Sequence, residues 1–274
     1  MSIEITLKLP EPLVENAERY GQATHRALET VLAEENAWDT RVGSISIPLE
    51  EATLSVVSDT PEVSQGTQPA QVIEALRSAV DGAERDVVVV TPFFVPNGND
   101  VEWYQRMVDR GVRVRILTNS LASNQGTISN SGLNKQRLGV VKAGVELHEL
   151  RTDAADKARW ETPPQVARYL GLHAKFYAID RERVFLGSVN LDPRSKFVNT
   201  EMGVLIDNTQ LAEVTADAIT RLMTTDNAWQ VEIGTDGRLQ WRSDTETVRR
   251  QPARGTGQRL ADRFYGLLPI SDYI

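Results

Sequence analysis

The sequence predicts an α/β fold in which helices cover both faces of a β-sheet. From about residue 69, stretches with apolar residues at helical spacing alternate with short apolar stretches rich in β-branched residues. The clearest strand candidate, Val87 to Val90, is apolar at every position, as expected of a strand that is buried on both faces. A β/α alternation of this kind is typical of a sheet between two layers of helices.

The elements follow one another in a regular order. We expect helices at residues 69–83, 100–110, 133–143 and 209–223, where apolar positions recur every three or four residues. Gly111 and Gly144 follow the second and third of these helices and are suitable helix ends. We expect strands at residues 87–90, 112–117, 145–150 and 202–206, and hairpins at residues 172–190 and 229–242.

The first hairpin carries the most informative motif of the chain. Residues 172–192 read LHAKFYAIDRERVFLGSVNLD, in which HxKxxxxD is followed by GSxN. Side chains two positions apart in a strand share a face, so His173 is expected beside Lys175, and Ser188 beside Asn190. Two adjacent strands would bring these four polar side chains around one anion, and Gly187 would allow a close approach.

An imidazole, an ammonium, a hydroxyl and an amide suit a phosphodiester. A neutral imidazole can attack phosphorus, and fixed polar groups can stabilise the charge on the equatorial oxygens. This chemistry needs no metal or other cofactor. One group must attack while another protonates the departing alkoxide, and a single histidine can hardly do both at once.

This pattern resembles the phospholipase D superfamily, whose signature is HxKxxxxD with a downstream GSxN. The resemblance implies a phospholipase D-like mixed β-sheet flanked by helices on both faces, with a single half of the usual two-motif site. It implies that His173 forms a phosphohistidine or acts as the acid, and that Lys175, Ser188 and Asn190 hold the phosphate. The simpler alternative is a strand whose solvent-exposed face carries a histidine and a lysine without a catalytic role.

Two acidic residues complete the candidate set. By the same resemblance, Asp180 has a structural or orienting role and does not attack phosphorus. Glu201 matches the carboxylate that in relatives accepts a hydrogen bond from the catalytic imidazole and fixes its tautomer.

The resemblance narrows to the C-terminal half of bacterial cardiolipin synthases of the C type. It rests on residues 87–96, 110–121, 143–150, 192–195 and 267–269. Residues 38–61 resemble the connector between the two halves of that group, so we expect a connector-like segment at 1–66 and a catalytic domain with one HxKxxxxD motif at 67–274. The resemblance implies a second such motif, from a homodimer mate or from a complementing first-half chain.

The chain departs from this group after Leu121. Asn130 replaces a histidine and Leu133 replaces a tyrosine in a region expected to border the substrate groove. We therefore keep three hypotheses: a phosphodiesterase or phosphatidyltransferase acting on a phospholipid or another phosphodiester, an inactive truncated half, and a non-catalytic module that binds phospholipid or phosphate.

Composition limits the partners and the compartment. With 30 basic and 38 acidic residues, the formal net charge of −8 argues against a general nucleic-acid binder. The chain has no cysteine, and its three histidines lack the spacing of metal ligands. No signal peptide or spanning helix is evident, so we expect a cytoplasmic protein, soluble or peripheral at the inner face of the cell membrane.

Three segments are less defined. Residues 13–32 have a helical pattern that includes His25, and residues 151–166 form a polar stretch expected to be a loop over the groove. Residues 259–268 are amphipathic and carry two arginines. Such a helix could lie on an anionic bilayer, but packing on the core is the simpler expectation.

Overall fold

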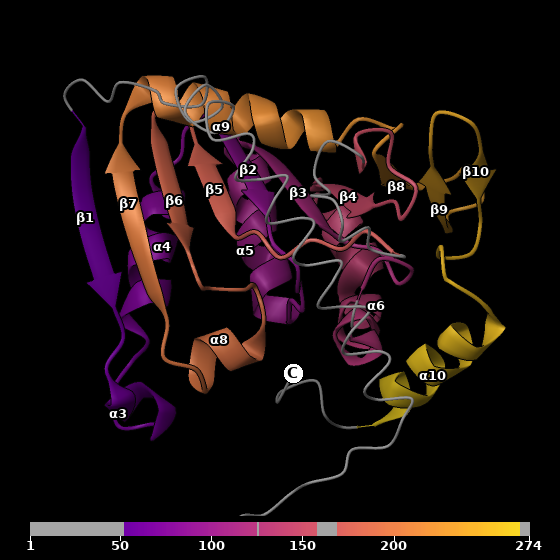
Figure 1. Ribbon diagram of the computed structural model, residues 1–274, viewed down its shortest axis with the longest axis horizontal. Helices are drawn as coiled ribbons and strands as arrows, with labels where there is room; N and C mark the ends of the chain where they lie inside the picture. Colours follow the sequence, from indigo (N-terminus) through magenta and orange to yellow (C-terminus); the bar gives the residue numbers. More distant parts are fainter. Residues whose placement is uncertain (1–51, 125, 158–168, 269–274) are drawn as a thin grey trace, which may run out of the picture. The chain divides into compact units, whose positions relative to one another are not determined.

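The computed structural model describes residues 52–124, 126–157 and 169–268, which belong to one of the two compact units of the chain. These residues form a ten-stranded sheet in the order β1-β7-β6-β5-β2-β3-β4-β8-β9-β10 (Figure 1). β2, β3 and β4 are parallel, and the remaining neighbours pair antiparallel. The strands are β1 (Thr53–Ser58), β2 (Asp86–Val90), β3 (Arg113–Asn119), β4 (Glu146–Leu150), β5 (Phe176–Ile179), β6 (Arg183–Gly187), β7 (Met202–Asp207), β8 (Ala228–Ile233), β9 (Leu239–Arg242) and β10 (Thr247–Val248).

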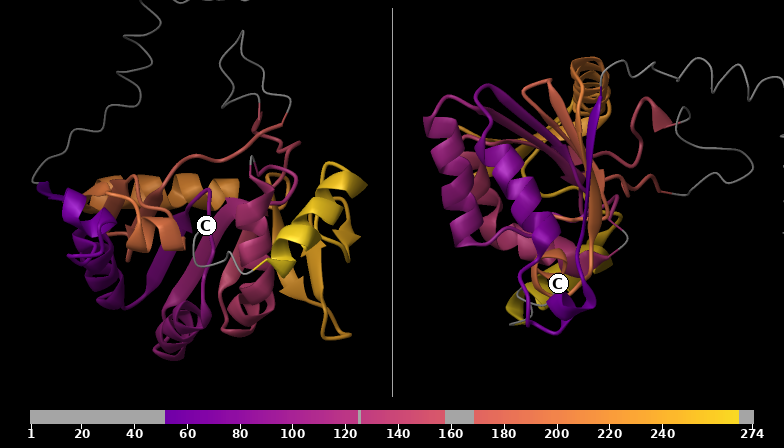
Figure 2. Two further views of the ribbon diagram at one scale, coloured as in Figure 1. Left: turned by 90° about the horizontal axis from the view of Figure 1, so that it is seen from below. Right: turned by 90° about the vertical axis from the view of Figure 1, so that its left-hand side faces the viewer.

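Helices cover both faces of this mixed sheet. The indigo-to-magenta helices lie on one side of the strands and the orange helix α9 on the other (Figure 2). The first group is α4 (Gln71–Asp81), α5 (Gly98–Asp109) and α6 (Thr127–Lys142), and α9 spans Thr209–Leu222. Three further helices are α3 (Pro61–Ser64), α8 (Pro193–Phe197) and α10 (Thr256–Leu267). The expected mixed α/β architecture is confirmed.

The two-sided burial explains why β2 is apolar throughout. Val87 and Val89 belong to the large core cluster beneath α4, α5 and α6, whereas Val88 and Val90 belong to the cluster beneath α9. Each fully buried valine contributes about 1.5–3 kcal/mol of burial free energy, so the central strand is held from both sides.

The elements differ from expectation at three places. α6 begins at Thr127, six residues before the expected start, because its first turns bury polar side chains and therefore lack an apolar period. β5 begins at Phe176, after the HxK residues. β1 was not expected, and it pairs with β7 from Thr53 opposite Asp207 to Ser58 opposite Met202. The division of the chain at residues 66 and 67 stays a prediction. The expected helix at 13–32, and residues 158–166 of the expected loop, lie outside the described residues.

A close approach of two strands accounts for Gly187. It lies opposite Gly203 in the β6–β7 pair, and a Cβ atom on Gly187 would meet the carbonyl oxygen of Met202 and lie 2.8 Å from the Cα atom of Gly203. The obstacles are backbone atoms, which cannot rotate away.

We expect the substitution Gly187→Ala to lower the free energy of unfolding by about 1–3 kcal/mol, because it forces the two strands apart. The matched control is Gly98→Ala at the start of α5, where a Cβ atom meets nothing within 4 Å. Urea unfolding of both variants measures the difference. Equal stability of the two variants would contradict the close approach.

Candidate active site

The HxK and GSxN residues meet at one end of the β5–β6 hairpin. Phe176 lies opposite Leu186, so the residues before β5 adjoin those after β6. The chain folds in this way because residues 176–187 supply two short apolar strands with a polar turn between them. His173, Lys175 and Ser188 consequently line one open hollow of about 440 Å³.

Lys175 is the buried member of this group, whereas His173 and Ser188 are exposed. Its Nζ donates a hydrogen bond to the backbone carbonyl oxygen of His173 at 2.9 Å. Burial lowers the pKa of the Lys175 ammonium, and the negative charges of Glu201 and Asp192 oppose this effect. An ammonium held in this way offers a fixed positive charge to an anion in the hollow.

Glu201 is buried beside the GSxN residues, and both of its carboxylate oxygens accept hydrogen bonds there. It accepts hydrogen bonds from the Ser188 hydroxyl, from Ser195 Oγ at 2.8 Å and from Asn199 Nδ2 at 3.0 Å. Among the described residues, no hydrogen bond joins Glu201 to the imidazole of His173. In this structure the carboxylate therefore positions Ser188 and not the histidine.

Asn190 is held by its backbone. Its N–H donates to Ser195 Oγ at 3.0 Å, and Ser195 is placed by α8, which Asp192 caps by accepting from the Ser195 N–H at 2.8 Å. The side-chain oxygen of Asn190 is buried without a hydrogen-bond partner. Asn190 does not line the hollow that contains His173, Lys175 and Ser188.

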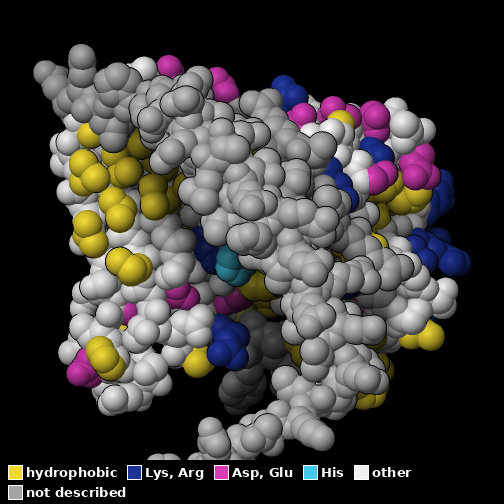
Figure 3. Space-filling view, in the orientation of Figure 1, with side chains coloured by type: hydrophobic (Ala, Val, Ile, Leu, Met, Phe, Trp, Pro, Cys, Tyr) yellow, Lys and Arg dark blue, Asp and Glu magenta, His cyan; other side chains and the backbone are white. Residues whose placement is uncertain are grey.

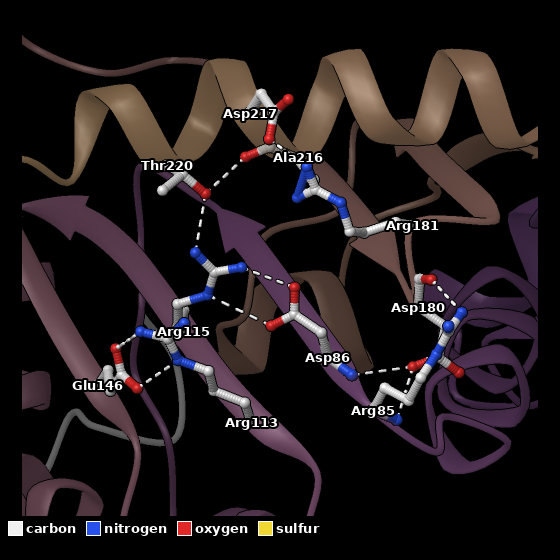
Figure 4. Close-up of polar contacts among 10 residues, drawn as sticks. All are labelled: Arg85, Asp86, Arg113, Arg115, Glu146, Asp180, Arg181, Ala216, Asp217 and Thr220. Atoms are coloured by element: carbon white, nitrogen blue, oxygen red, sulfur yellow. Dashed lines mark hydrogen bonds and ion pairs between the residues drawn. The ribbon is translucent and has the colours of Figure 1, made fainter.

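Asp180 lies at the opposite end of β5 from Lys175. Its carboxylate accepts hydrogen bonds at 2.8–2.9 Å from three backbone N–H groups at the start of β2, those of Arg85 and Asp86 (Figure 4) and that of Glu84. Asp180 and Arg181 have φ angles of 52° and 58°, as in a type I′ hairpin turn. Burial raises the pKa of Asp180, but the backbone donors and the Arg85 charge outweigh it, so the pKa is lowered. Asp180 thus fastens the hairpin to β2.

Asp59 is a contributor that the motif did not reveal. One carboxylate oxygen accepts from the Glu201 N–H at 3.0 Å, and the other accepts from the Val72 N–H at 3.0 Å, at the start of α4. Asp59, like Ser195, lies in a stretch on which the family resemblance rests. Motif spacing could not show that both residues support Glu201.

The expectation for Asn130 and Leu133 is corrected by their burial. Leu133 belongs to the main core cluster, and Asn130 Nδ2 donates to Asp262 of α10 at 2.7 Å. Both are 2 % exposed, and neither lines the hollow at His173. They connect α6 to the rest of the molecule and do not border the candidate site.

A partly exposed apolar surface adjoins the hollow. Val56, Val204, Leu186 and Phe176 form one row across β1, β7, β6 and β5. Val56 is 69 % exposed and Met202, next to this row, is 56 % exposed. Hydrophobic side chains gather over these strands (Figure 3). We name Val56, Phe176, Leu186, Met202 and Val204 the apolar sheet face.

A comparison with known protein families shows to which family the chain belongs. Residues 76–223, more than half of the chain, match the family described as cardiolipin synthase, PLD-like domain. The chain belongs to this family. All the candidate residues from His173 to Glu201 lie within the matched segment of this PLD-like domain, whereas Asp59 precedes it.

Relatives of the PLD-like chain are longer than the chain itself. Cardiolipin synthase C of Escherichia coli K12 is 30 % identical over 254 residues, which are 90 % of this chain and 53 % of that protein. Cardiolipin synthase A of Yersinia pseudotuberculosis is 26 % identical over 182 residues, 64 % of this chain and 33 % of that protein. The chain spans about half or less of the length of these relatives.

Two solved structures are also similar to the chain. Nuc, a phospholipase D family member from Salmonella typhimurium, matches with 20 % identity and a TM-score of 0.46, covering 62 % of this chain and 93 % of Nuc. Phosphatidylserine synthase of Haemophilus influenzae matches with 14 % identity and a TM-score of 0.46, covering 65 % of this chain and 40 % of that protein.

Two features are absent from the described part of the PLD-like chain. No helix there is both long enough and apolar enough to cross a bilayer. No cluster of three or more His, Asp or Glu side chains suited to a metal ion occurs there either.

We expect Asp180→Ala to lower the free energy of unfolding at pH 7 by about 1–2 kcal/mol, because three backbone donors lose a charged acceptor. The lowered pKa means that this contribution is present above the unfolded-state pKa of about 3.9 and is lost as the pH falls through the folded-state value. Urea unfolding at pH 7 and near pH 3 should therefore show a difference that shrinks in acid.

The matched control for this prediction is Asp217→Ala. Asp217 of α9 forms an ion pair with Arg181 of the same turn, but the Asp217 side chain is largely exposed, so its loss should cost less than about 1 kcal/mol. If the effect of Asp180→Ala on the free energy of unfolding does not depend on pH, or is as small as that of Asp217→Ala, Asp180 does not fasten the hairpin to β2 in the proposed way.

Proposed function

We propose that this chain is one half of a phospholipase D-type enzyme, a phosphodiesterase or phosphatidyltransferase that acts on phospholipids. The observation that carries the proposal is the hollow in which His173, Lys175 and Ser188 converge, within the segment that matches the family. A nucleophile, a fixed cation and a hydroxyl around one open space are the groups that phosphoryl transfer requires.

The reaction proceeds in two displacements. A ring nitrogen of His173 attacks phosphorus, an N–P bond forms, and the P–O bond to the departing alcohol breaks while a second imidazolium protonates the alkoxide. That second imidazole, now neutral, takes a proton from a glycerol-type alcohol or from water, whose oxygen attacks phosphorus and breaks the N–P bond. Lys175 stabilises the equatorial oxygens directly; Ser188 does so once its hydroxyl is released from Glu201, and Asn190 once its side chain turns toward the hollow.

The second histidine is supplied by a homodimer mate or by a complementing first-half chain. The apolar sheet face supports this, because it lies beside the hollow and leaves Val56 and Met202 more than half exposed. Covering such a face removes apolar area from water and would bring a second motif next to the first. A two-fold axis through this region would make the two contributions equivalent.

The alternative is a non-catalytic module that binds phospholipid or phosphate, or an inactive truncated half. One observation favours it: Glu201 contacts Ser188 and leaves the imidazole of His173 without a hydrogen bond to any described residue. The histidine then lacks a group that would fix its tautomer.

The two functions differ in whether a covalent intermediate forms. We expect the full chain, given a 32P-labelled phospholipid and quenched in alkali, to retain label as phosphohistidine. His173→Asn should abolish the label and reduce turnover by about 10³-fold or more, because it removes the nucleophile. His25→Asn is the matched control and should keep both. Turnover without label, or turnover by His173→Asn, would end the phosphohistidine mechanism.

Introducing a charged side chain on the apolar sheet face tests where the second histidine comes from. We expect the wild-type chain to be a dimer by light scattering and Val56→Glu to be a monomer with at least about tenfold less activity, because a buried unpaired carboxylate opposes association. The control Val214→Glu alters a half-exposed valine of α9 and should remain an active dimer. If the wild-type chain is a monodisperse monomer and is active, the homodimer is excluded. If it is a monodisperse monomer and is inactive, a separate partner chain is favoured as the source of the second histidine.

A further inference from the structure

The helix α10 is attached to the molecule by its polar side. Its one buried residue is Asp262, whose carboxylate accepts hydrogen bonds from Asn130 at 2.7 Å and from Asn134 and Gln251 at 2.6 Å each. One turn earlier, Gln258 Nε2 donates to the carbonyl oxygen of Leu121 at 2.6 Å. These contacts hold α10 against α6 and the loop after β3.

The apolar side of α10 consequently points into solvent. Leu260 and Phe264 are each 60 % exposed and Leu267 is 83 % exposed. At about 100° per residue, these three side chains fall within about 60° of one another, and Asp262 lies about 140–160° away from each. A helix that packs on a core buries its apolar stripe, so the expected core packing of residues 259–268 is wrong for these side chains.

The surroundings of this stripe are basic, although the chain as a whole is acidic. Residues 249–268 contain five arginines and a single carboxylate, the buried Asp262. The arginines are Arg249, which forms an ion pair with Asp236, Arg254, which lies over the Tyr169 ring, and Arg250, Arg259 and Arg263. Arg263 lies on α10 about 60° from Leu260, is exposed, and forms no ion pair with a described residue.

We propose that α10 is a membrane-docking helix that binds the surface of an anionic phospholipid bilayer. Leu260, Phe264 and Leu267 enter the boundary between headgroups and acyl chains, and the flanking arginines contact lipid phosphates. The apolar centre selects a bilayer over nucleic acid, which offers no apolar layer for such side chains. The inference does not depend on the phosphohistidine chemistry.

Flotation of the full chain with vesicles tests the proposal. We expect the wild-type protein to float with phosphatidylglycerol vesicles, to float much less with phosphatidylcholine vesicles, and to be released by high salt. The double substitution Phe264→Ser with Leu267→Ser should weaken binding to phosphatidylglycerol by at least about tenfold, because two large apolar side chains no longer enter the bilayer. Arg263→Glu should weaken it severalfold and reduce its salt dependence.

The matched control is Val214→Ser with Ile233→Ser, which removes two exposed apolar side chains from α9 and β8. This control should bind vesicles as the wild type does. Thermal unfolding and turnover of a water-soluble phosphodiester should be unchanged in all these variants, so a failure of docking is separable from a failure of catalysis.

Three results would overturn the proposal. They are absence of the wild-type protein from the floated fraction, equal flotation of the α10 variant and the wild type, and a change of oligomeric state in the α10 variant without a change in vesicle binding. The last result would assign the apolar stripe to a second copy of the chain.

Discussion

The buried carboxylate of Glu201 is the constraint on which the candidate site depends. Its side chain joins the end of β6 to the helix α8 through Ser188 and Ser195, and its backbone is joined to Asp59 by two hydrogen bonds. Asp59 in turn binds the first turn of α4. Of the three side chains that donate to the carboxylate, Ser195 is buried, so removal of the carboxylate would leave this hydroxyl without its acceptor and without water.

The same carboxylate determines what Ser188 can do. A hydroxyl has one proton to donate, and in this structure Ser188 donates it to Glu201. Ser188 therefore cannot donate to a phosphate in the hollow while this contact exists. If Glu201 turns toward the imidazole of His173, the hydroxyl becomes available to the ligand. The hydrogen bond between Glu201 and the His173 imidazole that the family resemblance implies stays a prediction.

The sequence predicts the centre of the fold well and its margins poorly, for a physical reason. Strands such as β2 are buried on both faces, and that burial leaves a continuous apolar stretch that can be recognised. β1 is exposed at five of its six residues, so its pairing with β7 leaves no pattern in the sequence. The first turns of α6 bury Asn130 and Ser131, and this reverses the usual relation between polarity and exposure.

The candidate site, like the fold, was predictable only in part: the motif residues could be placed from the sequence, and the partners of Glu201 could not. The spacing of HxK and GSxN places His173, Lys175 and Ser188 together because two paired strands leave little freedom. The partners of Glu201 depend on side-chain contacts between segments up to 142 residues apart, about which spacing carries no information. The place of Asp180 follows from geometry, since a strand as long as β5 separates it from Lys175 and leaves it free to bind β2.

Asn130, one of the two positions at which the chain departs from the cardiolipin synthase pattern, belongs to a series of polar contacts that joins β4, α6 and α10. Arg137 is buried on α6, donates to Glu149 of β4 at 2.7 Å and to Asn130 at 3.1 Å, and Asn130 donates to Asp262 of α10. Buried charges of this kind are tolerated when every partner is present, and they specify position more than they add stability. The side of α10 that carries Asp262 is thus fixed by polar contacts, whereas Leu260, Phe264 and Leu267 on its other side stay exposed.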